Sequence, residues 1–546
     1  MTRSLYGLIH RRNGPRLGLV QQRGRMKETW LSQRTPATSA LVPADCGEKL
    51  QGRRVAVVGG GFAGLMAART LCRHGAKVTV FEARAQLGGR VLSDTTFGNC
   101  RIVEAGAELI GSIHTYWCRL AIEYGLGLIT RTDVEDFGGM QLSAKLTLDK
   151  PLSMDEIAAL GEEMERRVLR PMAELAKSIR DPAQPWLDNA LQQYDAMSVA
   201  DYLVKLGIDP NSRLWKAVDM LLRNNNVAPL EQLNFLGLLC LVRGGQTGTI
   251  GEPLMGYWDE LEIYRCAEGC QKLAHAIASD IQTRHKCRIL KSSPVTHIDL
   301  SKDAKPRSKD CKPDDVKITY KDGKSGKSML ECFADVVFAV PPTVWGDVKI
   351  TPVHPQEPNQ VGLIGTGPAV KFFSALQNRF WIKESAAPAG GSLDLGQIWE
   401  ATDNQMREQC GIVLAVFAGA GAPQTPQDFQ SRLSKLYPGY AGALVKGKCP
   451  LFVDWPRQPF IKTGYCSPRL RQIFTVGKAL NRPFLDRMFF AGEHTQMDHF
   501  GYMEGALRSG ERAALQLMRR ACGLPASPQP QAPVLVAQRE SAAELQ

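Results

Sequence analysis

The sequence predicts an α/β protein built on a doubly wound parallel sheet, with an α+β domain inserted into it. Two apolar runs, at 55–58 and 77–81, have the β-branched composition of buried parallel strands. The residues between them have the apolar spacing of a helix. A third apolar strand near the end of the chain, at 488–490, returns to the same sheet. The long helical and charged stretch at 153–220 belongs to the insertion.

The glycines after the first strand have the spacing that lets a backbone hold a dinucleotide. Gly59 permits a tight turn, Gly61 lets the chain approach a pyrophosphate, and Gly64 lets the helix lie close to the strand. Ala63 belongs to the same helix start, where free N–H groups and a partial positive charge favour phosphate. The sequence therefore predicts a Rossmann-like nucleotide site, in preference to a glycine-rich turn that binds nothing.

Glu82 ends the second strand, where a carboxylate accepts hydrogen bonds from ribose hydroxyls and disfavours a 2′-phosphate. The ligand is therefore FAD or NAD. Ala83 follows, and then a Gly88-Gly89-Arg90 turn, in which an arginine fork can reach a phosphate.

Here the chain resembles the flavin-containing amine oxidase family, which includes monoamine, polyamine and L-amino acid oxidases. In that family E-A-x-x-x-x-G-G-R follows the first βαβ unit, and its arginine contacts the FAD pyrophosphate; Glu82 to Arg90 fits this pattern. The resemblance covers about residues 53–520. It implies an FAD-binding, Rossmann-like domain of the GR2 type.

Two motifs near the end of the chain carry the most specific part of the resemblance. They are Ala491-Gly492-Glu493-His494 and Gly501-Tyr502-Met503-Glu504-Gly505-Ala506. The family wraps them around the flavin ring. Gly492 would then lie close to the ring, Glu493 on the ribityl or ribose side, and the Met503 N–H near flavin N1. By the same resemblance, Val295 would pair with the adenine.

Lys371 lies in an apolar strand, where burying an ammonium without a partner is costly. A strand-end lysine that reaches solvent is the alternative. The family places a lysine at this spot, bridged through a water to flavin N5.

Tyr465 and Tyr502 fall where the family places the two walls of an aromatic cage in front of the flavin. Two ring faces attract a substrate nitrogen and orient its neighbouring C–H bond. Trp455 packs against the flavin or the cage, or is a core residue.

Three departures from the family refine these expectations. Gly464 stands where monoamine oxidases carry the cysteine bonded to the flavin, so we expect non-covalent FAD. Leu109 replaces the arginine with which L-amino acid oxidases bind the substrate carboxylate. Arg243 and Arg265 are then the candidates for that carboxylate.

Some bacterial amino acid oxidases of the family nevertheless resemble this chain, with an E-x-G-x-E-x-I-G loop followed by H-x-x-W, and this resemblance of the Glu104–Trp117 loop favours an L-amino acid substrate. Glu108 would then contact a cationic group of the substrate, or merely the flavin loop.

The expected organisation follows from these motifs. The FAD domain is discontinuous, a helical and a mixed-sheet substrate subdomain interrupt it, and both ends are disordered. The FAD domain comprises 53–112, 265–300 and 452–522. The helical subdomain is 113–264 and the mixed-sheet subdomain is 301–451. The disordered ends are the basic extension 1–52 and the tail 523–546.

Composition excludes some partners. The net charge of +12 is concentrated in residues 1–27, a basic segment without acids that reads as a disordered arm or, alternatively, a targeting peptide. It lacks the interleaved aromatics of a nucleic-acid site. No apolar run approaches the roughly 20 residues of an integral membrane segment.

The 14 cysteines show no metal-site spacing, so we expect no metal and mostly reduced cysteines.

Together these features predict a cytoplasmic enzyme, or an organellar or exported one if the basic segment is a targeting peptide. A homodimer is compatible with the sequence. The expected reaction is FAD-dependent oxidation of an L-amino acid by molecular oxygen to 2-oxo acid, ammonia and hydrogen peroxide. The first alternative is a monoamine or polyamine oxidase that yields an aldehyde. A flavin desaturase and a flavin-binding protein without turnover are further alternatives.

Overall fold

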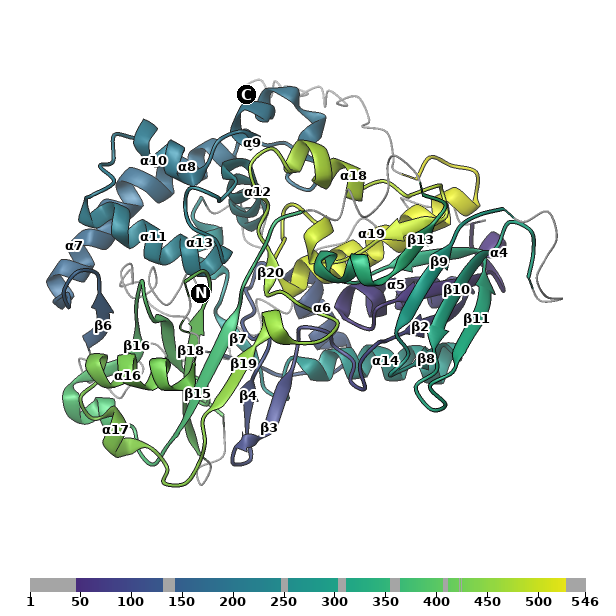
Figure 1. The fold of residues 1–546 in the computed structure, drawn as a ribbon. Coiled ribbons are helices and arrows are strands. Elements are labelled where there is room, and N and C mark those ends of the chain that lie inside the picture. Colours follow the sequence, from purple (N-terminus) through teal and green to yellow (C-terminus); the bar gives the residue numbers. More distant parts are fainter. Residues whose placement is uncertain are drawn as a thin grey trace, which may run out of the picture.

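The computed structural model describes residues 46–130, 143–246, 254–302, 311–353, 364–405, 411–421, 423 and 425–526. Figure 1 shows a parallel sheet with its helices on one side of the molecule and a mixed sheet with further helices on the other. Residues 1–45 of the expected basic extension and 527–546 of the expected tail lie outside the described residues. The end of that extension folds as helix α4 (Cys46–Leu50).

The predicted nucleotide-binding sheet is present, and the predicted fold class is confirmed. All its strand pairs are parallel, in the order β21-β12-β1-β2-β8. Its strands are β1 (Arg54–Val58), β2 (Lys77–Phe81), β8 (Arg288–Leu290), β12 (Asp335–Phe338) and β21 (Met488–Phe490). The last strand thus returns to the first sheet, as the sequence predicts.

The two faces of this sheet are covered differently, since successive residues of a strand point to opposite sides. Val55 and Val57 pack against α5 (Phe62–Arg73), α14 (Gln271–His285) and α19 (Met503–Ala521). Ala56 and Val58 belong to the core shared with a second, four-stranded sheet. That sheet has the order β11-β10-β9-β13 and contains β9 (Val295–Asp299), β10 (Val316–Lys321), β11 (Ser328–Phe333) and β13 (Lys349–Thr351).

Two strands correct the expected domain boundaries. β12 lies within 301–451, the range expected for the mixed-sheet subdomain, yet it pairs with β1 and β21 in the nucleotide-binding sheet. Its residues are buried on both faces, as an interior parallel strand requires. β19 (Leu451–Asp454) pairs with the mixed sheet, although 452–454 were expected in the FAD domain.

The substrate half combines a mixed sheet with a group of helices. The sheet has the order β19-β15-β18-β17-β16-β6, and only the β16–β6 pair is parallel. Its other strands are β6 (Ser143–Thr147), β15 (Val370–Leu376), β16 (Ala386–Ser392), β17 (Gly396–Glu400) and β18 (Ile412–Ala418). The helices are α7 (Met154–Met164), α8 (Arg170–Ala176), α9 (Gln192–Asp195), α10 (Val199–Lys205), α11 (Arg213–Asn226), α12 (Phe235–Gln246) and α13 (Gly256–Glu260).

Short elements connect these bodies and place the loops of the site. They are β3 (Ser93–Gly98), β4 (Arg101–Glu104), α6 (Thr115–Glu123), β5 (Leu128–Thr130), β7 (Tyr264–Cys266), β14 (Thr366–Gly367), α16 (Pro426–Leu436), α17 (Tyr440–Ala443), β20 (Tyr465–Cys466) and α18 (Lys478–Leu480). None of the helices in the described part of the chain is both long and apolar enough to cross a bilayer.

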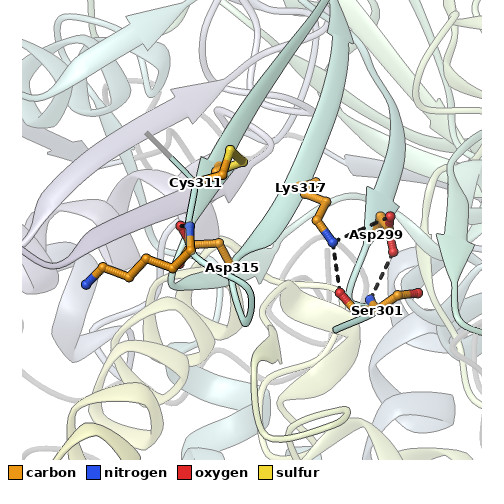
Figure 2. The surroundings of a disulfide bond; sticks show 7 residues. Asp299, Ser301, Cys311, Asp315 and Lys317 are labelled. Atoms are coloured by element: carbon orange, nitrogen blue, oxygen red, sulfur yellow. Dashed lines mark hydrogen bonds and ion pairs between the residues drawn. A yellow bond between two sulfur atoms is a disulfide. The ribbon is translucent and has the colours of Figure 1, made fainter. Parts of the chain in front are cut away.

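A disulfide joins Cys311 to Cys332, which lies on β11, with 5.4 Å between the Cα atoms. Figure 2 shows Lys317 of β10 nearby, directed toward Ser301 and Asp299; its Nζ donates to the Ser301 carbonyl at 2.9 Å. The disulfide therefore fastens the segment before β10 to β11 of the four-stranded sheet.

Most of the cysteines that the structure describes are free, as expected, and four of them are disulfide-bonded. Cys100 and Cys522 are disulfide-bonded as well as Cys311 and Cys332. Scattered spacing gave no sign of these bonds; that between Cys311 and Cys332 forms where the segment before β10 lies beside β11. The free cysteines among the described residues are buried, apart from Cys449.

Replacing both Cys311 and Cys332 with serine should lower the free energy of unfolding by about 2–4 kcal/mol, because the crosslink restricts the unfolded chain. The thermal midpoint under non-reducing conditions measures this loss. Cys449→Ser, which removes an exposed free thiol, is the matched control and should leave the midpoint unchanged. Equal midpoints for the double variant and the wild type would contradict the crosslink.

Candidate active site

A cavity of about 410 Å³ extends from the carboxyl end of β1 to the mixed sheet. Most of the predicted site residues line it, although they come from distant parts of the chain. These are Gly59, Gly61, Ala63, Glu82, Ala83, Gly89, Arg90, Glu108, Val295, Lys371, Trp455, Tyr465, Gly492, Glu493, Tyr502 and Met503.

The glycine-rich loop and the second glycine turn meet at the start of α5. Gly88 N donates to Gly60 O at 3.0 Å, and Gly59 adopts a positive φ of 110°. Gly64 does not line the cavity; a β-carbon there would lie 1.9 Å from Gly59 O. Its role is the close approach of helix and strand, as predicted. The loop thus leaves bare backbone at a helix N-terminus, which fits a pyrophosphate.

Glu82 is buried at the end of β2 and holds this loop in place. Its carboxylate accepts from Gly60 N and from Arg84 N, each at 2.7 Å. Burial raises the pKa of Glu82. An acidic group that lines the cavity at this position suits a ribose.

Arg90 and Glu493 connect the two ends of the chain across the cavity. Arg90 Nη1 lies 2.8 Å from Glu493 Oε1 and donates to Gly464 O at 2.9 Å. Glu493 Oε2 also accepts from Gly501 N at 2.5 Å. This pair fixes the loop before α19, whose first residue, Met503, faces the cavity with no side-chain cap on the helix. The positive end of α19 therefore points toward the site.

Lys371 is buried on β15, so it does not reach solvent. Its Nζ donates to Glu108 Oε2 at 2.7 Å and to the Glu104 carbonyl at 2.8 Å. The partner that a buried ammonium needs is therefore Glu108, from the loop after β4.

Glu108 makes further contacts besides Lys371. Trp399 Nε1 donates to its Oε1 at 3.0 Å, and Arg265 Nε lies 3.6 Å from the same atom. Burial alone would raise its pKa, but the Lys371 and Arg265 charges lower the pKa of Glu108. Glu108 is thus an ionised carboxylate inside the cavity wall, and its role is wider than contact with the flavin loop.

The two predicted cage tyrosines lie close together. The Tyr465 hydroxyl donates to the Asn224 and Asn225 carbonyls at 3.2 and 3.1 Å. The Tyr502 hydroxyl lies 3.1 Å from that of Tyr257. A β-carbon on Gly501 would come within 3.0 Å of the Tyr465 ring, so this ring adjoins the residue before Tyr502. Both rings are therefore held through their hydroxyls.

Trp455 and Gly464 complete this wall. The Trp455 indole donates to Ala105 O at 3.1 Å and is buried while lining the cavity. A β-carbon at Gly464 would lie 2.6 Å from that of Ala369. The position thus has no room for a side chain, which fits flavin held without a covalent bond.

The two arginines proposed for a substrate carboxylate do not line the cavity that the described residues form. Arg265 is buried and donates to the Ala401 carbonyl at 2.6 Å; it also forms an ion pair with Asp403. Arg243 donates to Ile179 O at 3.1 Å from α12. Both expectations are corrected, because these guanidinium groups bind backbone or carboxylate within the protein.

Sequence reasoning missed several residues on the substrate side of the cavity. They are Asn225, Asn226, Leu241, Glu262, Trp399, Phe417 and Phe500. The run of three asparagines at the end of α11 was a visible signal, since amides are uncommon on a buried helix face. The others have no local motif.

Glu104 lies next to this network and titrates near neutrality. Its side chain accepts from Cys270 N at 2.6 Å and Ser93 Oγ at 2.8 Å, and burial raises its pKa from 4.5 to about 7. Between pH 4.5 and about pH 7, Glu104 keeps its proton in the folded protein but has released it in the unfolded chain. The contribution of Glu104 to the free energy of unfolding is therefore fully present below pH 4.5 and is lost as the pH rises through about 7.

Glu104→Gln removes this titration, so the variant should gain stability relative to the wild type as the pH rises from about 5 to about 8. The gain should approach 3 kcal/mol, roughly, for a pKa shift of this size. Thermal midpoints of both proteins across this range measure it. Parallel pH curves would contradict the assignment.

Comparisons with known proteins agree with this geometry. The model of the flavin containing amine oxidoreductase family matches residues 62–518. Flavin-containing amine oxidase A of Sus scrofa is 24% identical over 485 residues, covering 85% of this chain and 84% of its own.

Two solved structures share the fold. Putrescine oxidase bound to putrescine has a TM-score of 0.68 at 18% identity, over 86% of this chain and 99% of its own. Cyclohexylamine oxidase from Brevibacterium oxydans has a TM-score of 0.67 at 22% identity, over the same shares of the two chains. The predicted FAD cofactor is confirmed at the level of the family. The chain belongs to the flavin-containing amine oxidoreductases.

Proposed function

We propose that this protein oxidises the C–N bond of a primary amine that carries no α-carboxylate, with non-covalent FAD and molecular oxygen, to an imine and hydrogen peroxide, and that water then hydrolyses the imine to an aldehyde and ammonia. One observation carries the proposal: Tyr465 and Tyr502 line the same cavity, and the Lys371 ammonium in its wall is already paired with Glu108. This favours the amine alternative over L-amino acid oxidation, since Arg243 and Arg265 lie outside the cavity.

The residues at the other end of the cavity suit the parts of FAD. Gly59, Gly61 and Gly89 offer backbone to the pyrophosphate, and Glu82 offers a carboxylate to the adenosine ribose. Val295, at the start of β9, also lines the cavity and would adjoin the adenine. When bound, FAD accepts the two electrons removed from the amine, while the protein supplies orientation and electrostatics.

The substrate nitrogen binds as the neutral amine between Tyr465 and Tyr502. Ring faces accept from the N–H groups of a neutral amine, and rings fixed by Tyr257 and by the Asn224 and Asn225 carbonyls hold the adjacent C–H bond in one direction. The substituent of the amine then meets the apolar walls of Leu241, Trp399, Phe417 and Phe500. We therefore expect an aromatic or aliphatic substituent.

Lys371 supplies a fixed positive charge at the flavin side of the cavity. Because Glu108 and the Glu104 carbonyl hold its ammonium, it stays in one position without any reorganisation during turnover. Its third N–H is available to orient a water or to stabilise negative charge on oxygen as it is reduced.

Peroxide release from the FAD-loaded protein tests the proposal. The panel contains five amines (phenethylamine, benzylamine, cyclohexylamine, putrescine and spermidine) and the L-amino acids. We expect peroxide with amines and none with amino acids. Peroxide with amino acids alone would overturn the proposal. Anaerobic loss of flavin colour with amines, without peroxide in air, would overturn oxygen as the acceptor.

Replacing Tyr502 with leucine should lower kcat/KM for the preferred amine about 5- to 30-fold, since a cage ring contributes about 1–2 kcal/mol. Steady-state kinetics measure the loss, and FAD titration should show unchanged affinity. Tyr437→Phe is the control, because this buried tyrosine donates to Ala387 O away from the cavity. Unaltered kinetics in Tyr502→Leu would show that the ring does not contact the substrate.

A further inference from the structure

We propose that the side-chain amides of Asn225 and Gln397 together bind a hydroxyl group on the substrate, so that the preferred amine carries a hydroxyl on its substituent, as a phenol does. This inference rests on the proposed amine oxidation and deepens it by naming the class of substituent. The two amides act on binding and selectivity, and they take no part in the oxidation of the C–N bond.

The first argument is the place of Gln397 in the mixed sheet. Phe417 of β18 is paired with Lys371 on one neighbouring strand and with Gln397 on the other. Residues directly opposite each other in antiparallel strands share a face, so the three side chains form one row. Neighbouring strands lie about 4.8 Å apart, which puts Gln397 roughly 10 Å from Lys371. The row therefore leads away from Lys371, past Phe417 in the cavity wall, to Gln397.

The second argument is that Asn225 brings its amide to the same place from another element. It lies on α11, lines the cavity, and accepts with its Oδ1 from Gln397 Nε2 at 3.2 Å. Its backbone carbonyl accepts from the Tyr465 hydroxyl. The Tyr465 ring stacks on that of Phe417, with 6.4 Å between the ring centroids and 15° between the ring planes. The amide pair therefore adjoins a cage tyrosine, within reach of the substituent of an amine held there.

The third argument is the hydrogen-bonding capacity that remains in the pair. Asn225 Nδ2 and Gln397 Oε1 have no hydrogen-bond partner among the described residues, although the two side chains are only 7% and 3% exposed. Leaving a donor and an acceptor buried and unpaired is costly, so polar atoms in protein interiors normally have partners. Turning both amides over exchanges their oxygen and nitrogen atoms, and it again leaves one nitrogen and one oxygen unpaired. The pair therefore offers one donor and one acceptor in either orientation.

A hydroxyl group matches such a pair better than a charged group does. It donates one hydrogen bond and accepts another, whereas an ammonium only donates and a carboxylate only accepts. Either ion would leave one of the two amide groups unpaired and would lose its own hydration. The side chains beside Gln397 on the same face of the sheet, Trp399 and Phe417, are aromatic and line the cavity. We therefore expect the hydroxyl on a flat, aromatic substituent.

Matched substrates that differ by one group test the proposal in the FAD-loaded wild type. Tyramine should exceed phenethylamine in kcat/KM about tenfold or more, since a buried site that hydrogen-bonds a hydroxyl rejects the analogue without it. Among aliphatic amines, 5-aminopentan-1-ol should exceed cadaverine, which ends in an ammonium instead. Equal kcat/KM for tyramine and phenethylamine, or a preference for cadaverine, would overturn the proposal.

Two variants remove the amides while nearly keeping the size of the side chains, Gln397→Met and Asn225→Leu. In each of them the ratio of kcat/KM for tyramine to that for phenethylamine should fall toward one. Gln377→Met is the matched control and should keep the wild-type ratio, because this exposed amide donates to Leu444 O outside the cavity. A wild-type ratio in both Gln397→Met and Asn225→Leu would contradict the assignment. If neither variant folds, the comparisons in the wild type decide.

Binding without turnover separates this inference from the proposed function. The Kd of 4-ethylphenol in the holoenzyme, measured by calorimetry, should rise about tenfold or more in Gln397→Met, whereas the Kd of ethylbenzene should not rise. A wild type that oxidises amines, with the same Kd of 4-ethylphenol in Gln397→Met, would overturn the hydroxyl site alone. A wild type that oxidises no amine, with the expected change in that Kd, would overturn the proposed function and support the hydroxyl site.

Discussion

The buried ion pair between Lys371 and Glu108 joins the two halves of the protein at the cavity. Lys371 comes from β15 of the mixed sheet, and Glu108 from the loop that follows β4. Removing two charges from water is costly, and their attraction offsets the cost only when the remaining donors and acceptors are satisfied. Trp399, Arg265 and the Glu104 carbonyl meet that condition here. The cavity wall therefore depends on both halves being in place.

The same dependence explains why local patterns predicted one end of the cavity better than the other. The glycine loop, Glu82 and Arg90 lie within one βαβ unit and its following turn, so spacing along the chain fixes their positions. The C-terminal motif is equally compact, since Glu493 holds the Gly501 N–H through a short loop. Residues that are close together in the sequence form motifs from which their contacts can be predicted.

The substrate end lacks such a signal, because its contacts join residues more than 100 positions apart. Glu108 meets Lys371 and Trp399, and Tyr502 meets Tyr257, across elements that are far apart in the sequence. Arg265 was assigned to a substrate on charge alone, whereas the fold gives it Asp403 as a partner. The same limit applied to β12, whose apolar composition suits any buried sheet, and to the disulfide of Cys311.

Charge pairing also explains how one fold can serve different amine substrates. An α-carboxylate needs a cation with an unmatched charge, and a cavity gains one either by an added arginine or by losing the partner of a lysine it already has. In this chain Leu109 occupies the position of the arginine, and the neighbouring Glu108 matches the lysine. On the proposed amine oxidation, this loop would therefore offer no arginine to a carboxylate, and the lysine near it is already paired. On the same proposal, the aromatic and apolar walls of the cavity would then select the substrate.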